Sequence, residues 1–308
     1  MLYPLLFKPI ILPKVWGSER WVLSTCGGNE SVVRNGYLEG NTLQEVIETY
    51  LDELLGGRVY DAFGEAFPLL CKFIHVEDNL SVQVHPDDAS AACEGLNGKT
   101  EMWYMHDAAP DASILLGFNR NTSAEEVKSL LAENRIMDVL CHQSVQRGDA
   151  AYIPAGRVHA LCKGAHVAEI QQNSDVTYRL YDYNRPGLDG KLRPLHIDQA
   201  LAVLDYSALK EPLLNYACGA NEAANLVKDS HFVTNLVRLN RPMVREMEEL
   251  DSFVIYMCVN GSVRVACPHD GSESVVIEKE DAVLIPASMS GVELTPIGGE
   301  AELLETYM

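Results

Sequence analysis

Short apolar runs that alternate with polar residues, or that are rich in β-branched and aromatic residues, recur along most of this chain. Such runs are typical of β-strands. We expect strands at 69–76, 80–85, 100–105, 113–117, 150–154, 166–172, 176–181, 231–239, 252–258, 262–267, 274–278, 282–286 and 291–295. Many short strands at close spacing indicate a sandwich or a barrel, so the predicted fold class is mainly β.

A few segments have the apolar spacing of an amphipathic helix instead. The pattern predicts accessory helices at 41–55, at 123 to about 140, and at 197–205. Thr42 with Glu45, and Ser123 with Glu126, stand at the spacing of a capping box. A capping box marks the first turn of a helix, so these pairs fix where the first two helices begin.

One segment of the pattern occurs twice. Residues 148–159 read GDAAYIPAGRVH, and residues 280–291 read EDAVLIPASMSG. Both are a strand that ends in a Pro-Ala turn, so we infer one barrel unit used twice. Gly291 stands where the first copy has His159, so the second copy cannot perform the chemistry of His159 with the same residue.

The irregular stretch at 206–228 separates the two halves of the pattern. We therefore expect two domains. The first, 1–205, would carry the chemistry and the accessory helices, and the second, 206–308, would be a barrel without a metal.

Charge limits the possible partners. The chain has 24 Lys and Arg against 44 Asp and Glu, a formal net charge of −20. Such a surface repels nucleic acid and anionic lipid, so we expect neither as a partner. An anionic substrate would need a local pocket of Lys and Arg.

Cysteine usage and the N-terminus indicate a cytoplasmic protein. The eight cysteines are irregularly spaced and form no CxxC pair, which favours reduced thiols over a disulfide scaffold. The apolar start is broken by Pro4, Pro9 and Pro13 and lacks a basic segment, so we expect no signal peptide. No apolar run approaches the roughly 18 residues of a membrane span.

The run LSVQVHP, residues 80–86, has the first candidate chemistry. Side chains alternate between the faces of a strand, so Ser81, Gln83 and His85 share one face. If that face lines a barrel, a metal would satisfy the Gln oxygen and the His nitrogen together. The alternative is a polar edge exposed to solvent.

Two further segments supply candidate ligands. Glu101 lies among apolar and aromatic residues in GKTEMWYM, with Lys99 on its face, and His159 follows a Pro-Ala-Gly turn. With Gln83 and His85 these residues fit a four-ligand zinc site. The set His85, Glu101 and His159 also fits the facial triad of non-haem iron, so the ligand types leave the metal open.

A cation completes the candidate site. In 174–185, Thr177, Arg179 and Tyr181 share a face if the segment is a strand. The permanent charge of Arg179 suits an anion or an oxyanion. The alternative is an arginine paired with one of the many acids.

These motifs together resemble one family. FPLLCKFIHVEDNLSVQVHP (67–86), GKTEMWY (98–104), YIPAGRVHAL (152–161) and EIQQNSDVTYRLYDYNR (169–185) are similar to type I mannose-6-phosphate isomerases, also called phosphomannose isomerases, in their short bacterial form. The resemblance covers about residues 1–205. It implies two cupin-type (jelly-roll) β-barrels and one Zn²⁺ per chain.

The resemblance also implies roles for single residues. The metal ligands would be Gln83, His85, Glu101 and His159. The catalytic residues would be Arg179 and Lys99, and substrate would contact Ser81, Lys99 and Arg179, with Lys191 and Arg193 as weaker phosphate candidates. Some relatives have His before the pocket lysine, where this chain has Gly98, so a mechanism with that His as base cannot apply. The base stays open among Lys99, a zinc-bound water and a carboxylate.

The expected function is therefore an aldose–ketose isomerase that interconverts mannose 6-phosphate and fructose 6-phosphate through a cis-enediol. The expected partner is the sugar phosphate alone, in a monomer or weak homo-oligomer. Two alternatives remain from the residues: an iron-dependent cupin oxygenase and a non-catalytic sugar-binding cupin.

Overall fold

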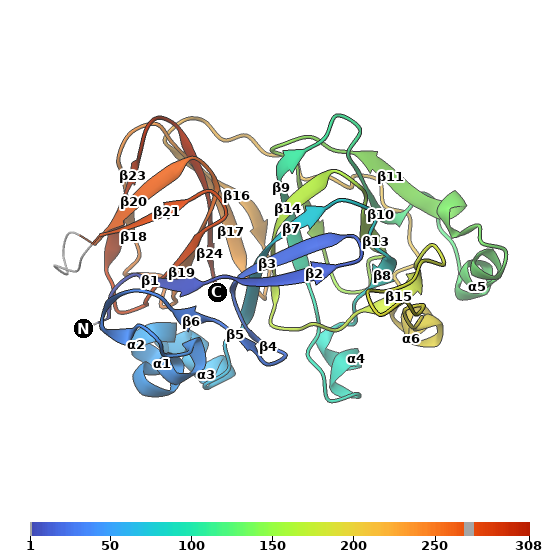
Figure 1. Cartoon of the computed structure of the whole chain (residues 1–308), viewed down its shortest axis with the longest axis horizontal. Coiled ribbons are helices and arrows are strands. Elements are labelled where there is room, and N and C mark those ends of the chain that lie inside the picture. Colours follow the sequence, from blue (N-terminus) through green and yellow to red (C-terminus); the bar gives the residue numbers. More distant parts are fainter. Residues whose placement is uncertain (1, 268–273) are drawn as a thin grey trace. The chain divides into compact units, whose positions relative to one another are not determined.

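The fold of this chain consists mainly of antiparallel β-sheets, as predicted (Figure 1). The structure is a computed structural model that describes residues 2–267 and 274–308. Contacts divide the chain into two compact units. The first unit comprises Ile11–Trp21 and Leu69–Leu214, and the second comprises Met1–Ile10, Val22–Pro68 and Asn215–Met308. Within the described ranges no helix is both long and apolar enough to cross a bilayer.

The first unit is built from two antiparallel sheets. One has the order β12-β9-β14-β7-β3-β2 and the other β11-β10-β13-β8-β15. The strands are β2 (Ile10–Lys14), β3 (Gly17–Leu23), β7 (Leu69–Val76), β8 (Val82–Val84), β9 (Glu101–Ala108), β10 (Ser113–Phe118), β11 (Leu140–Ser144), β12 (Ala150–Ile153), β13 (His159–Leu161), β14 (Ala165–Gln172) and β15 (Tyr178–Tyr181). Its helices are α4 (Asp88–Ala92), α5 (Ala124–Ala132), η2 (Ile136–Val139) and α6 (Ile197–Val203).

Apolar side chains from both sheets of the first unit share one core. Trp103 and Val167 of the first sheet cluster with Ile114 and Leu161 of the second. On its other face the second sheet is covered by α5 and α6, and there Val82 and Val84 pack. The apolar side chains of the alternating segment 80–86 therefore point toward the helices, and its polar side chains point into the space between the two sheets.

The second unit repeats this plan. Its two larger sheets have the orders β16-β17-β24-β19-β22-β1-β6 and β18-β23-β20-β21, and β4 pairs with β5 in a separate two-stranded sheet. The strands are β1 (Leu5–Lys8), β4 (Thr25–Cys26), β5 (Asn29–Glu30), β6 (Val32–Val33), β16 (Glu222–Lys228), β17 (Val233–Leu239), β18 (Met243–Glu246), β19 (Val254–Asn260), β20 (Ser262–Ala266), β21 (Val275–Glu278), β22 (Ala282–Ile285), β23 (Gly291–Pro296) and β24 (Ala301–Tyr307). Its helices are η1 (Gly36–Leu38), α1 (Leu43–Tyr50), α2 (Asp52–Leu55) and α3 (Gly57–Phe63).

The two units differ from the linear division at residue 205 expected from the sequence. Much of the N-terminal part groups with the C-terminal barrel. This grouping follows from strand pairing. β1 pairs with β22, with Leu5 opposite Leu284, and so extends the C-terminal sheet. In addition, Asp251 accepts hydrogen bonds from the backbone N–H groups of Gly57 and Arg58 at the start of α3. Pairings between distant segments are not visible in a linear pattern.

The predicted helices are shorter in the structure. The helix expected at 41–55 begins with the predicted capping box but divides into α1 and α2 at Leu51, whose φ is 47°. The helix expected to reach about residue 140 ends at Ala132, because Asn134 adopts a φ of 56° and stops the turn. At its start Ser123 caps the backbone, but Glu126 binds Arg120 instead of completing a capping box.

One glycine fixes the turn between β2 and β3. Gly17 has a φ of 140°, and a Cβ there would lie 2.0 Å from the carbonyl oxygen of His75. We therefore expect Gly17→Ala to lower the free energy of unfolding by about 2–4 kcal/mol. Gly28→Ala is the matched control: its φ is 76° but nothing lies within 4 Å, so about 1 kcal/mol of backbone strain is expected. Denaturant unfolding measures both, and equal losses would contradict the close approach.

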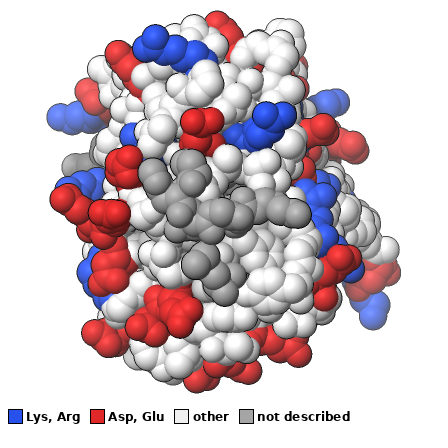
Figure 2. All heavy atoms as spheres, turned by 90° about the vertical axis from the view of Figure 1, so that its left-hand side faces the viewer, with Lys and Arg blue, Asp and Glu red and all other residues white. Residues whose placement is uncertain are grey.

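Acidic side chains are scattered over the face of the molecule in Figure 2, with fewer Lys and Arg among them. This distribution agrees with the formal net charge of −20. Any site for an anion must therefore gather its own cations against the field of the surrounding protein.

Candidate metal centre and active site

A row of functional side chains crosses the second sheet of the first unit. His159 of β13 is directly opposite Gln83 of β8, and Gln83 is directly opposite Arg179 of β15. Residues directly opposite one another point to the same face of a sheet. Ser81 and His85 lie two residues on either side of Gln83, so the strand brings five predicted site residues together.

His85, Glu101 and His159 form a buried cluster. Nε2 of His85 lies 3.5 Å from Oε2 of Glu101, and Nε2 of His159 lies 3.4 Å from Oε1 of Glu101. The three ligand atoms all lie within 4.8 Å of one another. Glu101 begins β9 in the facing sheet, so the cluster joins the two sheets.

The hydrogen bonds of both histidines leave Nε2 for a ligand. Nδ1 of His85 donates to the carbonyl of Val176 at 2.7 Å, and Nδ1 of His159 donates to the carbonyl of Arg157 at 2.8 Å. A backbone acceptor at Nδ1 fixes the tautomer with a lone pair on Nε2. Burial lowers the pKa of His159 to about 4 and holds the pKa of His85 well below its usual range, so both rings are neutral at pH 7.

Gln83 is placed to be a fourth ligand. Its Nε2 lies 3.3 Å from Nε2 of His159, and its Oε1 accepts a hydrogen bond from Ser81 Oγ at 3.2 Å. Turning the amide by 180° would direct its oxygen toward the histidine side, where a cation would attract it. The amide is therefore within reach of the cluster in either orientation.

Glu101 is a fully buried carboxylate with few partners for its oxygens. Oε1 accepts no hydrogen bond from a described residue, and Oε2 forms an ion pair with Lys99. Nζ of Lys99 lies 2.8 Å from Oε2 as an ion pair and 3.2 Å from His85 Nε2. Burial, and after it the negative charge of Glu169, raise the pKa of Glu101 to about 7 against the opposing effect of Lys99.

This donor set fits a divalent metal. It offers two imidazole nitrogens, a buried carboxylate and an amide oxygen, and such mixed nitrogen and oxygen sets bind zinc and its neighbours. A cation would supply a partner for Oε1 of Glu101, which accepts no hydrogen bond from a described residue.

A second row of side chains, one aromatic and two charged, crosses the facing sheet. Trp103 of β9 is opposite Glu169 of β14, and Glu169 is opposite Lys72 of β7. Trp103 Nε1 donates to Glu169 Oε2 at 2.6 Å, and Lys72 Nζ lies 2.9 Å from Glu169 Oε1 and 3.8 Å from Glu19 Oε2. Burial favours a protonated Glu169, but Lys72 and Lys99 outweigh it and lower the pKa of Glu169.

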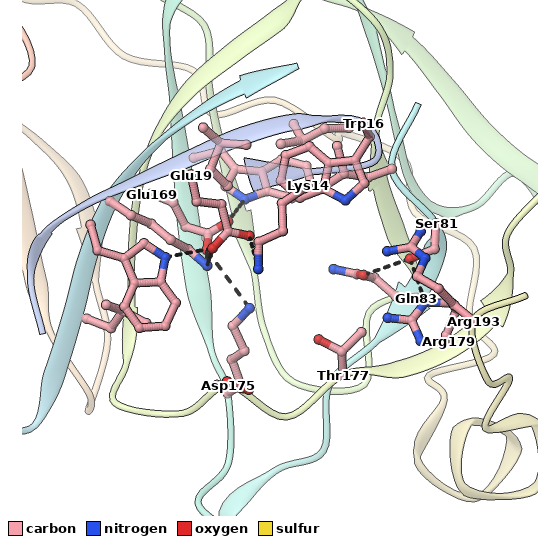
Figure 3. Close-up of a pocket in the computed structure, with 18 residues that line it drawn as sticks. Lys14, Trp16, Glu19, Ser81, Gln83, Glu169, Asp175, Thr177, Arg179 and Arg193 are labelled. Atoms are coloured by element: carbon pink, nitrogen blue, oxygen red, sulfur yellow. Dashed lines mark hydrogen bonds and ion pairs between the residues drawn. The ribbon is translucent and has the colours of Figure 1, made fainter. Parts of the chain in front are cut away.

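A cavity of about 320 Å³ lies between these two rows (Figure 3). Ser81, Gln83, Arg179 and Arg193 gather at one end, while Glu19 and Glu169 lie toward the other. Cations and acids both line it: Lys14, Lys72, Lys99, Arg179 and Arg193 against Glu19, Glu169 and Asp175. Five cations against three acids give the local positive excess that an anionic substrate needs in this acidic chain.

The structure divides the predicted site residues between this cavity and the cluster of His85, Glu101 and His159, and Lys191 lies in neither. Ser81, Gln83, Lys99 and Arg179 line the cavity, whereas Lys191 is exposed and absent from its described lining. Arg193, the other candidate from the same loop, does line the cavity.

Several lining residues were not predicted from the sequence, namely Lys14, Glu19, Lys72, Glu169 and Asp175. Lys72 in LLCKFIHV and Glu169 in AHVAEIQQ each stand inside an otherwise apolar strand. A single charge within a buried strand is the signal that could have found these two.

The described part of the second unit keeps a version of one row but shows no cluster equivalent to His85, Glu101 and His159. Tyr256 of β19 is opposite Glu305 of β24, as Trp103 is opposite Glu169, and the Tyr256 hydroxyl donates to Glu305 at 2.8 Å. β13 and β23 are equivalent strands of the repeat. β13 begins at His159, and β23 begins at Gly291. The ligand position is therefore glycine in the second copy.

Comparisons with known proteins agree on one family. Residues 9–117 match the family "Phosphomannose isomerase type I, catalytic domain". The chain is 38% identical over 226 residues to mannose-6-phosphate isomerase ManA of Bacillus subtilis (strain 168), which covers 68% of this chain and 70% of that protein. A mannose-6-phosphate isomerase of Streptococcus mutans serotype c (strain ATCC 700610 / UA159) is 30% identical over 327 residues and covers 100% of this chain and 99% of its own length.

A solved structure extends the likeness to the whole chain. The crystal structure of the mannose 6-phosphate isomerase from Bacillus subtilis superposes with a TM-score of 0.88 at 28% identity, covering 100% of both chains. The fold and site thus define a cupin-type protein with a candidate metal centre. The chain belongs to the type I phosphomannose isomerases, and the resemblance and enzyme class predicted from the sequence are confirmed.

Proposed function

We propose that this chain is a zinc-dependent isomerase that interconverts mannose 6-phosphate and fructose 6-phosphate. The observation that carries the proposal is the buried cluster of His85, Glu101 and His159 beside a cavity with an excess of cations. The names of its relatives support the substrate. The volume of the cavity, about 320 Å³, is in the range of small-molecule sites.

Zinc is the metal that we propose. The carboxylate of Glu101 and the two imidazoles are zinc donors, and the amide oxygen of Gln83 would complete a four-donor set, with room for a substrate oxygen. A bound Zn²⁺ would supply Lewis-acid stabilisation of negative charge on substrate oxygens. An iron oxygenase is less well supported, because Gln83 would add a fourth ligand to the three of the facial triad and the cavity is lined by cations.

The isomerisation moves one proton from C2 to C1 and one from O2 to O1, through a cis-enediol, with no external oxidant or reductant. Lys99 reaches the ligand cluster and can donate to an oxyanion that develops there. Arg179 donates from Nε to Ser81 Oγ at 3.3 Å, so these two can bind an anionic group together. Arg193 takes the phosphate role expected of Lys191, because it lines the cavity.

The test is a coupled assay for fructose 6-phosphate formed from mannose 6-phosphate. Removal of the metal by a chelator is expected to lower kcat/KM by about 100-fold or more, and added zinc is expected to restore it. Elemental analysis should give one zinc per chain. If the zinc-loaded protein does not turn over mannose 6-phosphate, the proposal is wrong.

The same experiment separates the alternatives. Iron in the protein together with oxygen consumption would favour an oxygenase. Binding of sugar that needs no metal, without turnover, would favour a sugar-binding protein. The cytoplasmic location and the monomeric or weakly associated state stay predictions.

A further inference from the structure

Asp182, directly after β15, is a buried carboxylate that holds two arginines. Its side chain is 6% exposed. Arg193 donates from Nε to Oδ2 at 2.7 Å and from Nη2 to Oδ1 at 2.5 Å. Arg185 donates to Oδ1 from Nε at 3.3 Å and from Nη2 at 3.2 Å. The fork of Arg193 thus meets both oxygens of one carboxylate, which is the strongest geometry for this pair.

The two arginines lie in one loop but have different positions. Residues 183–195 connect β15 to α6, and Arg193 is the only one of them in the described lining of the cavity. Arg185 turns instead to Asp78 at 3.1 Å. Arg179 donates from Nη1 to the carbonyl of Pro194 at 3.0 Å, which ties the end of this loop to β15. Figure 3 shows Arg193 and Arg179 together at one end of the cavity.

Three guanidinium groups at this end repel one another. Burial lowers the pKa of Arg179, the charges of Arg193 and Arg185 lower it further, and Asp182 opposes them. Arg179, Arg185 and Arg193 against Asp182 and Asp78 leave a formal charge of +1, which favours an anionic group at this end of the cavity. Without Asp182, the flexible side chain of Arg193 would have no described carboxylate to hold it against this repulsion.

We propose that Asp182 is a positioning residue for phosphate recognition, which fixes the guanidinium of Arg193 beside Arg179 so that the two grip the phosphate of the substrate. This inference rests on the proposed function for the identity of the phosphate ester. A guanidinium that is held before binding loses less conformational freedom when phosphate binds, so positioning by Asp182 increases affinity. Asp182 acts through Arg193 and does not itself touch substrate.

The test compares Asp182→Asn, Arg193→Ala, Arg193→Lys and the double variant D182N/R193A with the wild-type enzyme. The readouts are kcat and KM for mannose 6-phosphate, the Kd of inorganic phosphate by calorimetry, the metal content and the Tm. Each single variant is expected to raise KM and the phosphate Kd by about 10-fold, the effect of one charge-assisted contact, with kcat within about twofold. Arg193→Lys is expected to follow Arg193→Ala, because a lysine keeps the charge but loses the fork.

The double variant and one control make the test specific. Because Asp182 acts through Arg193, D182N/R193A is expected to be no worse than R193A alone. Arg185→Ala is the matched control: it removes the other arginine of Asp182, outside the cavity, and is expected to change KM by less than about threefold.

Three results would overturn the inference. The first is a double variant in which the increases in KM and phosphate Kd of the two single variants add. The second is an Asp182→Asn protein that has lost its metal and has a lower kcat, with an unchanged KM. The third is an unchanged phosphate Kd in both single variants. If the wild-type protein does not turn over mannose 6-phosphate, the proposed function fails, but the phosphate titration still decides the role of Asp182.

Discussion

Replacing His159 with alanine is expected to abolish metal binding and to lower kcat/KM for mannose 6-phosphate by at least about 10³-fold. Its Nε2 lies 3.4 Å from Glu101 Oε1 and 3.3 Å from Gln83 Nε2, so it is central to the candidate ligand set. Removing one imidazole leaves a three-donor set that includes the neutral amide of Gln83. The measurements are metal content after dialysis and the coupled assay at saturating zinc.

A histidine of the same sheet provides the control. His142 lies in β11 and is exposed, so His142→Ala removes an imidazole without touching the cluster. It is expected to retain metal and activity. If His159→Ala kept one zinc per chain and wild-type turnover, the assignment of the metal centre would be wrong even if the protein is an isomerase.

Alternation along a strand made part of this site predictable. Ser81, Gln83 and His85 fall on one face by period alone, and the structure has Ser81 and Gln83 in the cavity wall with His85 in the cluster. Most predicted strands occur within a residue or two of their expected ends. The local pattern was sufficient there because these runs either alternate, as in 80–86, or are apolar nearly throughout, as in β7 and β10, whose side chains are buried on both faces.

Features that depend on pairing between distant segments could not be predicted. The row of Trp103, Glu169 and Lys72 exists only because β9, β14 and β7 are neighbours in a given register. The grouping of residues 22–68 with the C-terminal barrel has the same origin, since it follows from contacts far apart along the chain. The choice between Lys191 and Arg193 depended on the path of a loop, which periodicity does not determine.

The two rows have different tasks in the proposed mechanism. The row of His159, Gln83 and Arg179 offers ligands and a cation to the substrate. The row of Trp103, Glu169 and Lys72 is a buried charge network that holds cations in the cavity wall. The second unit keeps a version of this network around Glu305, with Arg245 as its cation at 2.7 Å. The network is therefore separable from the metal ligands, which the second unit lacks at the equivalent of His159.

This internal repeat gives the second large prediction, a matched pair of substitutions. Glu169→Gln is expected to lower the free energy of unfolding by about 3–5 kcal/mol, because it leaves the charge of buried Lys72 with Glu19 alone, at 3.8 Å. It is also expected to lower kcat/KM by about 10²-fold, since Lys99, 3.9 Å from Glu169, would lose part of what positions it.

Glu305→Gln makes the same change at the equivalent position of the second unit. Glu305 is held by Arg245, whose side chain is 30% exposed, so partial access to solvent reduces the expected loss to about 2 kcal/mol. Its activity is expected to stay within about twofold of wild type below the unfolding transition. Denaturant unfolding and the coupled assay measure both variants. Equal loss of activity in the two would mean that stability alone explains the effect of Glu169, whereas loss in Glu169→Gln alone would show that the first network supports catalysis.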